Sequence, residues 1–256
     1  MRKGEVHAVS RMRTSSIAGS LGGPAVSILG GASLLCVLLL TVRAYQVEFV
    51  KYAFLLWNLF LAWIPLFVSM TAVGLERSRR SPKPGLGFLI LVFAWLLFYP
   101  NAPYLTTDFI HLIADPSYNW HRIDESLIVW YDLVVFFIFS WCGLLLGYVS
   151  MRHFHMLVRH YGGPVAGWAF VGCTSFLAGF GVYLGRVVRL NSWDVLFSPF
   201  RLINGILGGL DHRGAIFTLL FGLLILIVYL SLYSLGSITL HTRKRPEPVG
   251  ERSAGT

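Results

Sequence analysis

Three ionisable residues, Asp108, His111 and Asp115, follow a long apolar run at the spacing i, i+3 and i+7. On a helix this spacing places all three side chains on one face. The apolar run ends in the sequence Y-P-N-A-P-Y at 99–104, where Pro100 disfavours a helical conformation at the residue before it. The sequence therefore predicts polar chemistry at a membrane boundary, beside a helix that is broken at its far end.

Two further ionisable residues lie inside apolar runs. Asp132 is expected about five residues inside one predicted helix, or roughly 8 Å deep at about 1.5 Å per residue, and Arg186 about one turn from the end of the next. Ions inside a membrane seldom lack a partner or a wet cavity. We therefore predict an Asp132–Arg186 pair, which either works in a site or only fixes the register of two helices.

Three interpretations fit these residues. Asp108 and His111 could bind a divalent metal that activates water, with Asp132 or Asp194 as a third ligand. His111 could instead act as a general base beside Asp108, while arginines hold an anionic group such as a lipid phosphate. In the third interpretation, the same residues only cap helices and pair charges at the interface.

We assign candidate catalytic roles to Asp108, His111 and Asp132. The candidate substrate-binding residues belong to the same membrane boundary, and two of them, Arg186 and Arg189, are expected to bind the anion. The full set is Asn101, Tyr104, Tyr183, Arg186, Arg189, Asn191 and Asp194. The chain contains no nucleophile elbow, Walker loop, dinucleotide-binding fingerprint or H-E-x-x-H motif.

The composition is that of an integral membrane protein. The mean hydropathy is +0.66, with 55% hydrophobic and 13% charged residues, whereas globular domains average about 25% charged residues. The first apolar run has a basic leader that could be a secretory signal. The run is longer than a usual signal core and ends in a poor cleavage site, so we favour an uncleaved helix.

Six apolar runs are predicted to cross the bilayer, which takes about 20 residues. One of them, 86–99, is short and begins after Pro84, a residue favoured at the first helical position. The other five runs are 25–42, 52–73, 127–151, 165–188 and 215–235. The predicted fold is all-α: a six-helix transmembrane bundle at 23–241 with short interfacial helices on its outer face, a basic segment at 1–22 and a disordered tail at 242–256.

The charge distribution predicts the topology. A net charge of +9 could suggest nucleic acid, but the basic residues lie in loops between the spans. Placing both termini in the cytoplasm puts twice as many of the 21 Lys and Arg residues inside as outside. We therefore predict no nucleic-acid partner and expect the lipid bilayer as the main partner.

The polar residues are unevenly distributed across the predicted bilayer. The outer half carries the candidate residues, whereas the inner half offers no ionisable side chain within its spans. His153, His155 and His160 are assigned to a basic inner loop, 152–163, as anchors at the membrane surface. This asymmetry argues against an ion relay across the whole membrane and favours a site that opens to the outside.

Two outer segments, 101–125 and 190–213, are predicted to hold short helices. Thr106 or Thr107 could cap the first. In the second, Asn191 would cap a helix whose first turn contains an acid, and the residues that follow resemble an amphipathic helix in the interface.

Small residues in the spans predict close packing. Two G-x-x-x-G spacings, 143–147 and 181–185, permit close approach, either of these two neighbouring helices, which we favour, or of two copies of the chain. Cys36, Cys142 and Cys173 have spacings that support neither a disulfide nor a thiolate metal site, and we expect them to be small buried hydrophobes.

Four sequence elements are long and specific enough to indicate a family. They are F-Y-P-N-A-P-Y-L-T-T-D-F-I-H-L at 98–112, W-Y-D-L at 130–133, S-W-C-G-L-L-L-G at 140–147 and G-V-Y-L-G-R-V-V-R-L-N-S-W-D-V-L at 181–196. The chain resembles the DUF1361 family of bacterial multi-pass membrane proteins in these elements. The resemblance implies a place in the bacterial inner membrane. It implies no catalytic role, because the function of that family is unknown.

Together these observations predict a membrane-embedded enzyme that acts on a lipid-linked or anionic envelope substrate. The alternative is a non-catalytic role, either as a component that binds or transports a small solute or as an accessory membrane subunit. Transport would require a second polar route to the cytoplasm, for which the sequence offers few residues.

Overall fold

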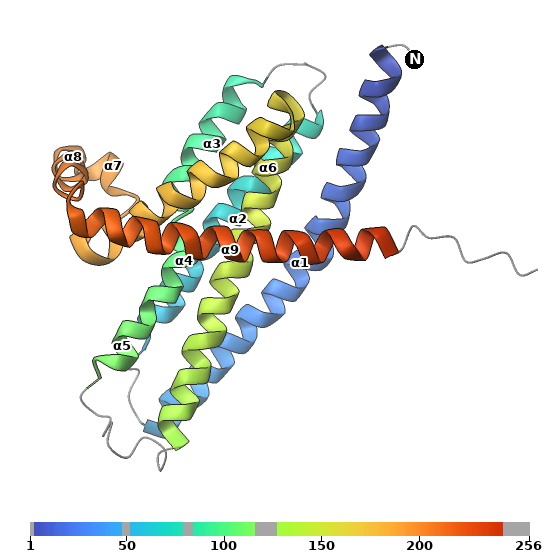
Figure 1. Ribbon diagram of the computed structural model, residues 1–256. Helices are drawn as coiled ribbons and strands as arrows, with labels where there is room; N and C mark the ends of the chain where they lie inside the picture. The colour runs from blue at the N-terminus through green and yellow to red at the C-terminus, as the bar shows by residue number, and fades with distance from the viewer. Residues whose placement is uncertain (1–2, 48–51, 79–83, 116–126, 243–256) are drawn as a thin grey trace, which may run out of the picture.

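The computed structural model describes residues 3–47, 52–78, 84–115 and 127–242, and its elements over these ranges are all helical (Figure 1). Five helical segments are long and apolar enough to cross a membrane. The longest, Leu127–Val188, bends at Gly163, and the two helical lengths on either side of the bend correspond to the predicted spans 127–151 and 165–188. The predicted all-α bundle with six spans is confirmed, and the expected disordered tail lies almost wholly outside the described residues.

The first two helices follow the predicted spans closely. Helix α1, Lys3–Val47, contains the first apolar run and also continues through the predicted basic segment. Helix α2, Phe54–Ser78, extends the second run by one turn and ends with Arg77 in its last turn. A basic residue at this position interacts favourably with the helix dipole.

The third span is broken where the prolines predict it. Helix α3, Leu86–Phe98, is followed by three short helices: α4 (Asn101–Tyr104), η1 (Leu105–Asp108) and α5 (Phe109–Ile113). The predicted threonine cap is wrong, because the Thr107 hydroxyl donates a 2.6 Å hydrogen bond to the Tyr104 carbonyl instead. That bond supports the tight helical turns after the prolines.

The fourth and fifth predicted spans form one long element, α6 (Leu127–Tyr183). Its two halves meet at Gly163, where φ is 82° and ψ is 179°, a conformation that glycine adopts at low cost. Pro164 follows and cannot donate a hydrogen bond to the preceding turn. The second half leads into η3, a π-helical turn at Leu184–Val188.

The broken segment 99–105 lies against the glycines of both halves of α6. A Cβ atom at Gly143 would overlap the Ala102 carbonyl, and one at Gly181 would overlap the Pro100 ring. The Ser140 hydroxyl also donates to the Leu105 carbonyl at 2.9 Å. The two G-x-x-x-G spacings do serve packing within the chain, and their partner is the broken segment. Our expectation that the two helices pack on each other through these glycines is wrong.

Helices α7 (Asp194–Phe197) and α8 (Pro199–Gly208) lie at one edge of the molecule, and α9 (His212–Thr242) crosses in front of the other helices (Figure 1). Asp211 begins α9, accepting a 2.7 Å hydrogen bond from the Gly214 amide, and this bond lowers the pKa of Asp211. Helix α9 packs against the second half of α6 where Gly179 meets the backbone at Gly222. We call the two ends of the bundle the α8 end and the Gly163 end.

The cysteines divide between core and surface. Cys36 and Cys142 are buried and their sulfur atoms lie 3.9 Å apart across α1 and α6. They are small core residues, as predicted, although their contact was not foreseen. Cys173 is exposed, so the expectation of burial is wrong for this residue.

Candidate functional site

Arg186 is the centre of a polar cluster at the α8 end. Its Nη2 donates to Asp108 Oδ1, and its Nε donates to Thr107 Oγ1 at 2.8 Å. Its guanidinium also stacks on the Tyr104 ring, with Cζ 4.2 Å from the ring centre. The side chain is fixed by two hydrogen bonds and one cation–π contact, and it remains 18% exposed.

The Asp108 carboxylate is fully buried and has a partner on each oxygen. Arg186 donates to one oxygen, and Asn58 Nδ2 of α2 donates to the other at 2.9 Å. A buried carboxylate is costly unless it is paired and hydrogen-bonded. These two donors meet that requirement, so Asp108 has little capacity left to bind a cation.

His111 completes the cluster at its exposed edge. Arg186 Nη1 lies 2.9 Å from His111 Nε2, and a guanidinium can only donate. Nε2 therefore accepts, and the neutral imidazole carries its proton on Nδ1. The ring also contacts Phe54, with the centres 4.6 Å apart. His111, an exposed residue, thus has an N–H donor at Nδ1 and uses its Nε2 lone pair for Arg186.

The backbone that carries Arg186 is unusual. Residues 184–188 form a π-helical turn, closed by a 3.0 Å hydrogen bond from the Leu190 amide to the Leu184 carbonyl. Arg189 follows in the left-handed region, with φ of 62° and ψ of 44°. Both features are uncommon, and both tend to occur at functional sites. The turn directs Arg186 toward the broken segment, where Gly185 packs on Tyr104.

The predicted Asp132–Arg186 pair is not formed. Asp132 binds Arg43 of α1 instead, through hydrogen bonds of 2.5 and 2.8 Å from Nε and Nη2. Both residues of this pair are buried. The sequence-based prediction treated Arg43 as a loop residue, although it directly follows an apolar run.

Four other candidates lie outside the cluster. Asn101 donates to Ser192 Oγ at 3.2 Å, and the Tyr183 hydroxyl donates to Asp211. Asp194 accepts a 2.8 Å hydrogen bond from the Asn191 backbone amide. The predicted Asn191 cap is wrong, because α7 begins after Trp193 and no side chain caps it. These residues hold the segment after α6 in place, and these hydrogen bonds do not reach the cluster.

Arg189 and Asp115 also lie outside the hydrogen-bonded cluster. The Arg189 side chain is exposed, and its carbonyl accepts from Arg201 at 3.4 Å. Asp115 accepts from the Tyr52 hydroxyl at 2.7 Å. It diverges from Asp108 and His111 because α5 ends at Ile113, so the predicted helical face does not extend to it.

The metal interpretation lacks a ligand set in the part of the chain that the structure describes. No group of three His, Cys, Asp or Glu side chains there is arranged to hold a metal ion. Asp132 and Asp194, the two carboxylates considered as third ligands, are engaged elsewhere. Among the candidate catalytic residues, Asp108 and His111 come together, but Asp132 does not join them.

The Gly163 end holds ionisable residues that were not expected inside a span. His153 and His155 are almost fully buried in α6, so their assignment to a surface loop is wrong. His153 Nδ1 lies 2.9 Å from Ser69 Oγ, and His155 Nδ1 lies 2.6 Å from the Tyr229 hydroxyl. His155 Nε2 is buried without a hydrogen-bond partner. The sequence signal that could have indicated the burial of His155 is the set of aromatic residues in α9 that face it.

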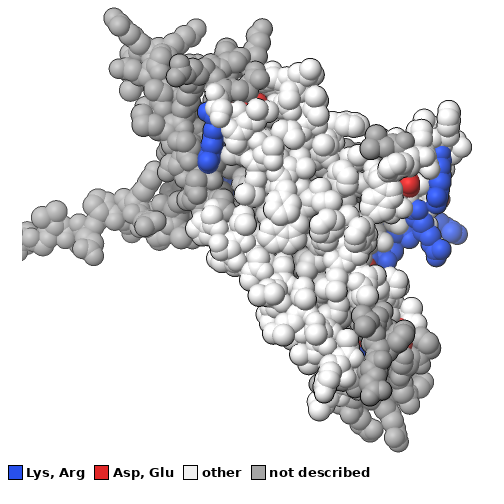
Figure 2. Space-filling view, turned by 180° about the vertical axis from the view of Figure 1, so that it is seen from behind, with Lys and Arg blue, Asp and Glu red and all other residues white. Residues whose placement is uncertain are grey.

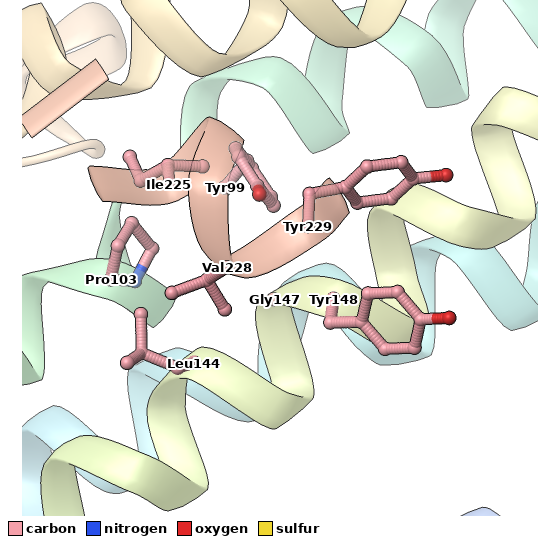
Figure 3. A pocket seen from close by; sticks show the side chains of 8 residues that line it. All are labelled: Tyr99, Pro103, Leu144, Gly147, Tyr148, Ile225, Val228 and Tyr229. Atoms are coloured by element: carbon pink, nitrogen blue, oxygen red, sulfur yellow. The ribbon is translucent and has the colours of Figure 1, made fainter. Parts of the chain in front are cut away.

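A small cavity separates the broken segment from α6 and α9 (Figure 3). Its volume is about 10 Å³, close to the space that one water molecule needs. Tyr99 and Pro103 line it from the broken segment, and the Tyr148 and Tyr229 hydroxyls point the same way, away from Pro103 (Figure 3). Tyr229 therefore contacts both this cavity and His155.

Comparison with known families gives one match. A family model, DUF1361, described as a protein of unknown function, matches residues 57–228. This chain belongs to the DUF1361 family. The resemblance seen in the sequence is thereby confirmed. No curated protein and no solved structure matches the chain.

The DUF1361 match covers the whole Arg186 cluster. Asn58, the broken segment and η3 all lie within the matched residues, whereas Arg43 lies outside them. The cluster is therefore built entirely from the DUF1361 region, and the Arg43–Asp132 pair links that region to α1.

Proposed function

We propose that this DUF1361 protein binds an anionic substrate, lipid-linked or free, at the outer face of the bacterial inner membrane, with both termini in the cytoplasm. Arg186 and His111 would bind the anion, and Arg189 would add positive charge beside them. The α8 end would then face outward, in agreement with the excess of basic residues predicted on the inner side.

The observation that supports this proposal is the set of hydrogen-bonding groups that remains after the contacts within the cluster are made. The Asp108 oxygens and the His111 Nε2 lone pair are occupied. Arg186 uses three of its five N–H groups for these side-chain contacts, and the exposed His111 carries an N–H donor at Nδ1. A site whose remaining groups are donors favours a ligand rich in acceptors, such as a phosphate or carboxylate.

The same arrangement limits the chemistry. His111 cannot accept a proton at Nε2 while Arg186 donates to that atom. If the protein is an enzyme, an anion that draws Arg186 away would free Nε2 to act as a general base. Substrate binding would then activate His111, and the resting cluster would be inactive.

The test is anion binding by the purified full-length protein in a neutral detergent. Isothermal titration with inorganic pyrophosphate should show saturable binding. His111→Ala should weaken it by about 10- to 100-fold, the range expected for one hydrogen bond to a charged group. The control is Arg77→Gln, an exposed arginine at the other end of the bundle, which should leave binding unchanged. Absence of binding by the wild-type protein, or unchanged binding by His111→Ala, contradicts the proposal.

A second candidate function is transport of a small solute, favoured by the buried polar groups at the Gly163 end. Tyr99, the cavity, Tyr229 and His155 lie at successive positions between the broken segment and that end. The sequence alone offered no such route. Uptake of phosphate into vesicles that contain the protein, reduced by Tyr99→Phe, would support transport, and uptake equal to that of empty vesicles would exclude it for phosphate.

A further inference from the structure

Helix α8 is fixed to the Arg186 turn on one side only. A Cβ atom at Gly205 would meet Leu190 and Val188, and one at Gly209 would meet Leu184. Arg201 of α8 also donates to the carbonyl of Arg189, the residue with positive φ. The helix is therefore held close to η3 by small residues and one hydrogen bond.

The other side of α8 presents large apolar side chains with no protein over them. These residues recur at helical spacing, and each has more than half of its surface exposed. They are Phe197 (79%), Phe200 (82%), Ile203 (51%), Leu207 (64%) and Leu210 (70%). A helix of 10 residues is about 15 Å long, too short to cross a bilayer of about 30 Å. Such a helix, attached to spanning helices, lies in the membrane interface.

Exposed arginines surround this apolar side. Arg189, Arg201 and Arg213 are all exposed, and Figure 2 shows basic side chains gathered at this edge of the molecule. The acidic residues near them, Asp211 and Asp194, accept hydrogen bonds from nearby backbone amides. The edge thus combines an apolar strip with excess positive charge, which matches the acyl chains and phosphate of an anionic phospholipid.

We propose that this edge, the α8 ledge (residues 197–210 with Arg189 and Arg213), binds an anionic phospholipid of the adjoining leaflet. The acyl chains lie along Phe200, Ile203 and Leu207, and the arginines bind the phosphate. The ledge is attached to η3, the turn that carries Arg186, so a lipid held there lies against that turn. This inference deepens the proposed function by naming its substrate class as a membrane-borne phosphate, and it rests on different residues.

The test compares phosphatidylglycerol with phosphatidylcholine of the same acyl chains. Native mass spectrometry of the full-length protein in neutral detergent should show at least about 30-fold preference for phosphatidylglycerol. Arg201→Gln with Arg213→Gln should lower that preference by about 30-fold, since each arginine near the surface contributes about 1 kcal/mol. Phe200→Ser with Leu207→Ser should weaken binding of both lipids. These side chains are exposed, so folding should be kept, and Arg77→Gln is the matched control.

Two outcomes would overturn the inference: equal binding of the two lipids by the wild-type protein, or an unchanged preference in the Arg201→Gln, Arg213→Gln variant. The proposed function fails separately. That proposal requires pyrophosphate binding that depends on His111. The ledge variants should change the affinity for pyrophosphate by less than about threefold, because the substituted residues do not contact the cluster. A wild-type protein that shows no lipid preference but still binds pyrophosphate would therefore refute the ledge alone.

Discussion

Arg43 and Arg186 each pair with a fully buried aspartate, but their guanidinium groups distribute their N–H donors differently. Arg43 makes a bidentate pair with Asp132. Arg186 divides its donors among Asp108, Thr107 and His111 and keeps an exposed edge. A bidentate pair adds geometric specificity as well as energy, which suits a contact that fixes two helices. The remaining N–H groups of the partly exposed Arg186 can donate to a ligand.

Removing Arg43 should destabilise the protein without affecting anion binding. Arg43→Gln leaves the Asp132 carboxylate buried without its charged partner, which costs about 3–5 kcal/mol. The Arg43→Gln, Asp132→Asn double variant should recover most of the loss. Thermal unfolding in detergent measures both, and a double variant no more stable than the single one would show that the charges do not act as a pair.

The Asp108–Arg186 pair should behave differently. Arg186→Gln should lower stability for the same reason, and the Asp108→Asn, Arg186→Gln double variant should recover stability. Pyrophosphate binding should remain lost in the double variant, because the cation that binds the anion is absent. A double variant that is stable and still binds pyrophosphate like the wild type would show that Arg186 has only a structural role.

At the scale of elements, the break in the third span was predictable and its packing was not. Two prolines within four residues predict the end of α3 from local conformation alone. The G-x-x-x-G spacings predict a close approach but do not specify the partner. Their partner is the broken segment, because the short turns 99–105 present backbone and small side chains that only glycine can meet closely.

Filling these glycine contacts should displace the segment that carries Tyr104 and Asp108. We expect Gly143→Ala and Gly181→Ala to lower the unfolding temperature and weaken pyrophosphate binding, since a Cβ at either position overlaps the segment. Gly172→Ala is the matched control in the same helix, because a Cβ there meets no atom within 4 Å. Equal stability of the three variants would contradict the packing described here.

For the whole molecule, hydropathy sufficed to predict the spans, whereas the orientation that the charge pattern predicts stays a prediction. The distribution of polar groups was predicted only in part. The α8 end is polar as expected, but His153 and His155 lie buried at the other end. Their position next to Arg152 suggested a surface loop. Partners on α2 and α9, distant in sequence, keep them inside, and local sequence patterns carry no information about such contacts.

The predicted orientation can be tested by labelling. In intact cells, a thiol reagent that cannot cross membranes should modify Arg213→Cys, at the α8 end, and should reach Arg77→Cys, at the Gly163 end, only after permeabilisation. Both parent residues are exposed. The parent background replaces the exposed Cys173 with Ser. The reverse labelling pattern would place the cluster and the ledge in the cytoplasm and reject an outer-face site.

The most direct measurement is an experimental structure of the protein with tungstate, an electron-dense analogue of phosphate. Our account predicts tungstate within hydrogen-bonding distance of Arg186 and His111 Nδ1, with Asp108 still bound to Asn58. An Arg186 side chain paired with Asp132, or a structure in which tungstate occupies other sites and leaves the Arg186 cluster empty, would contradict the account.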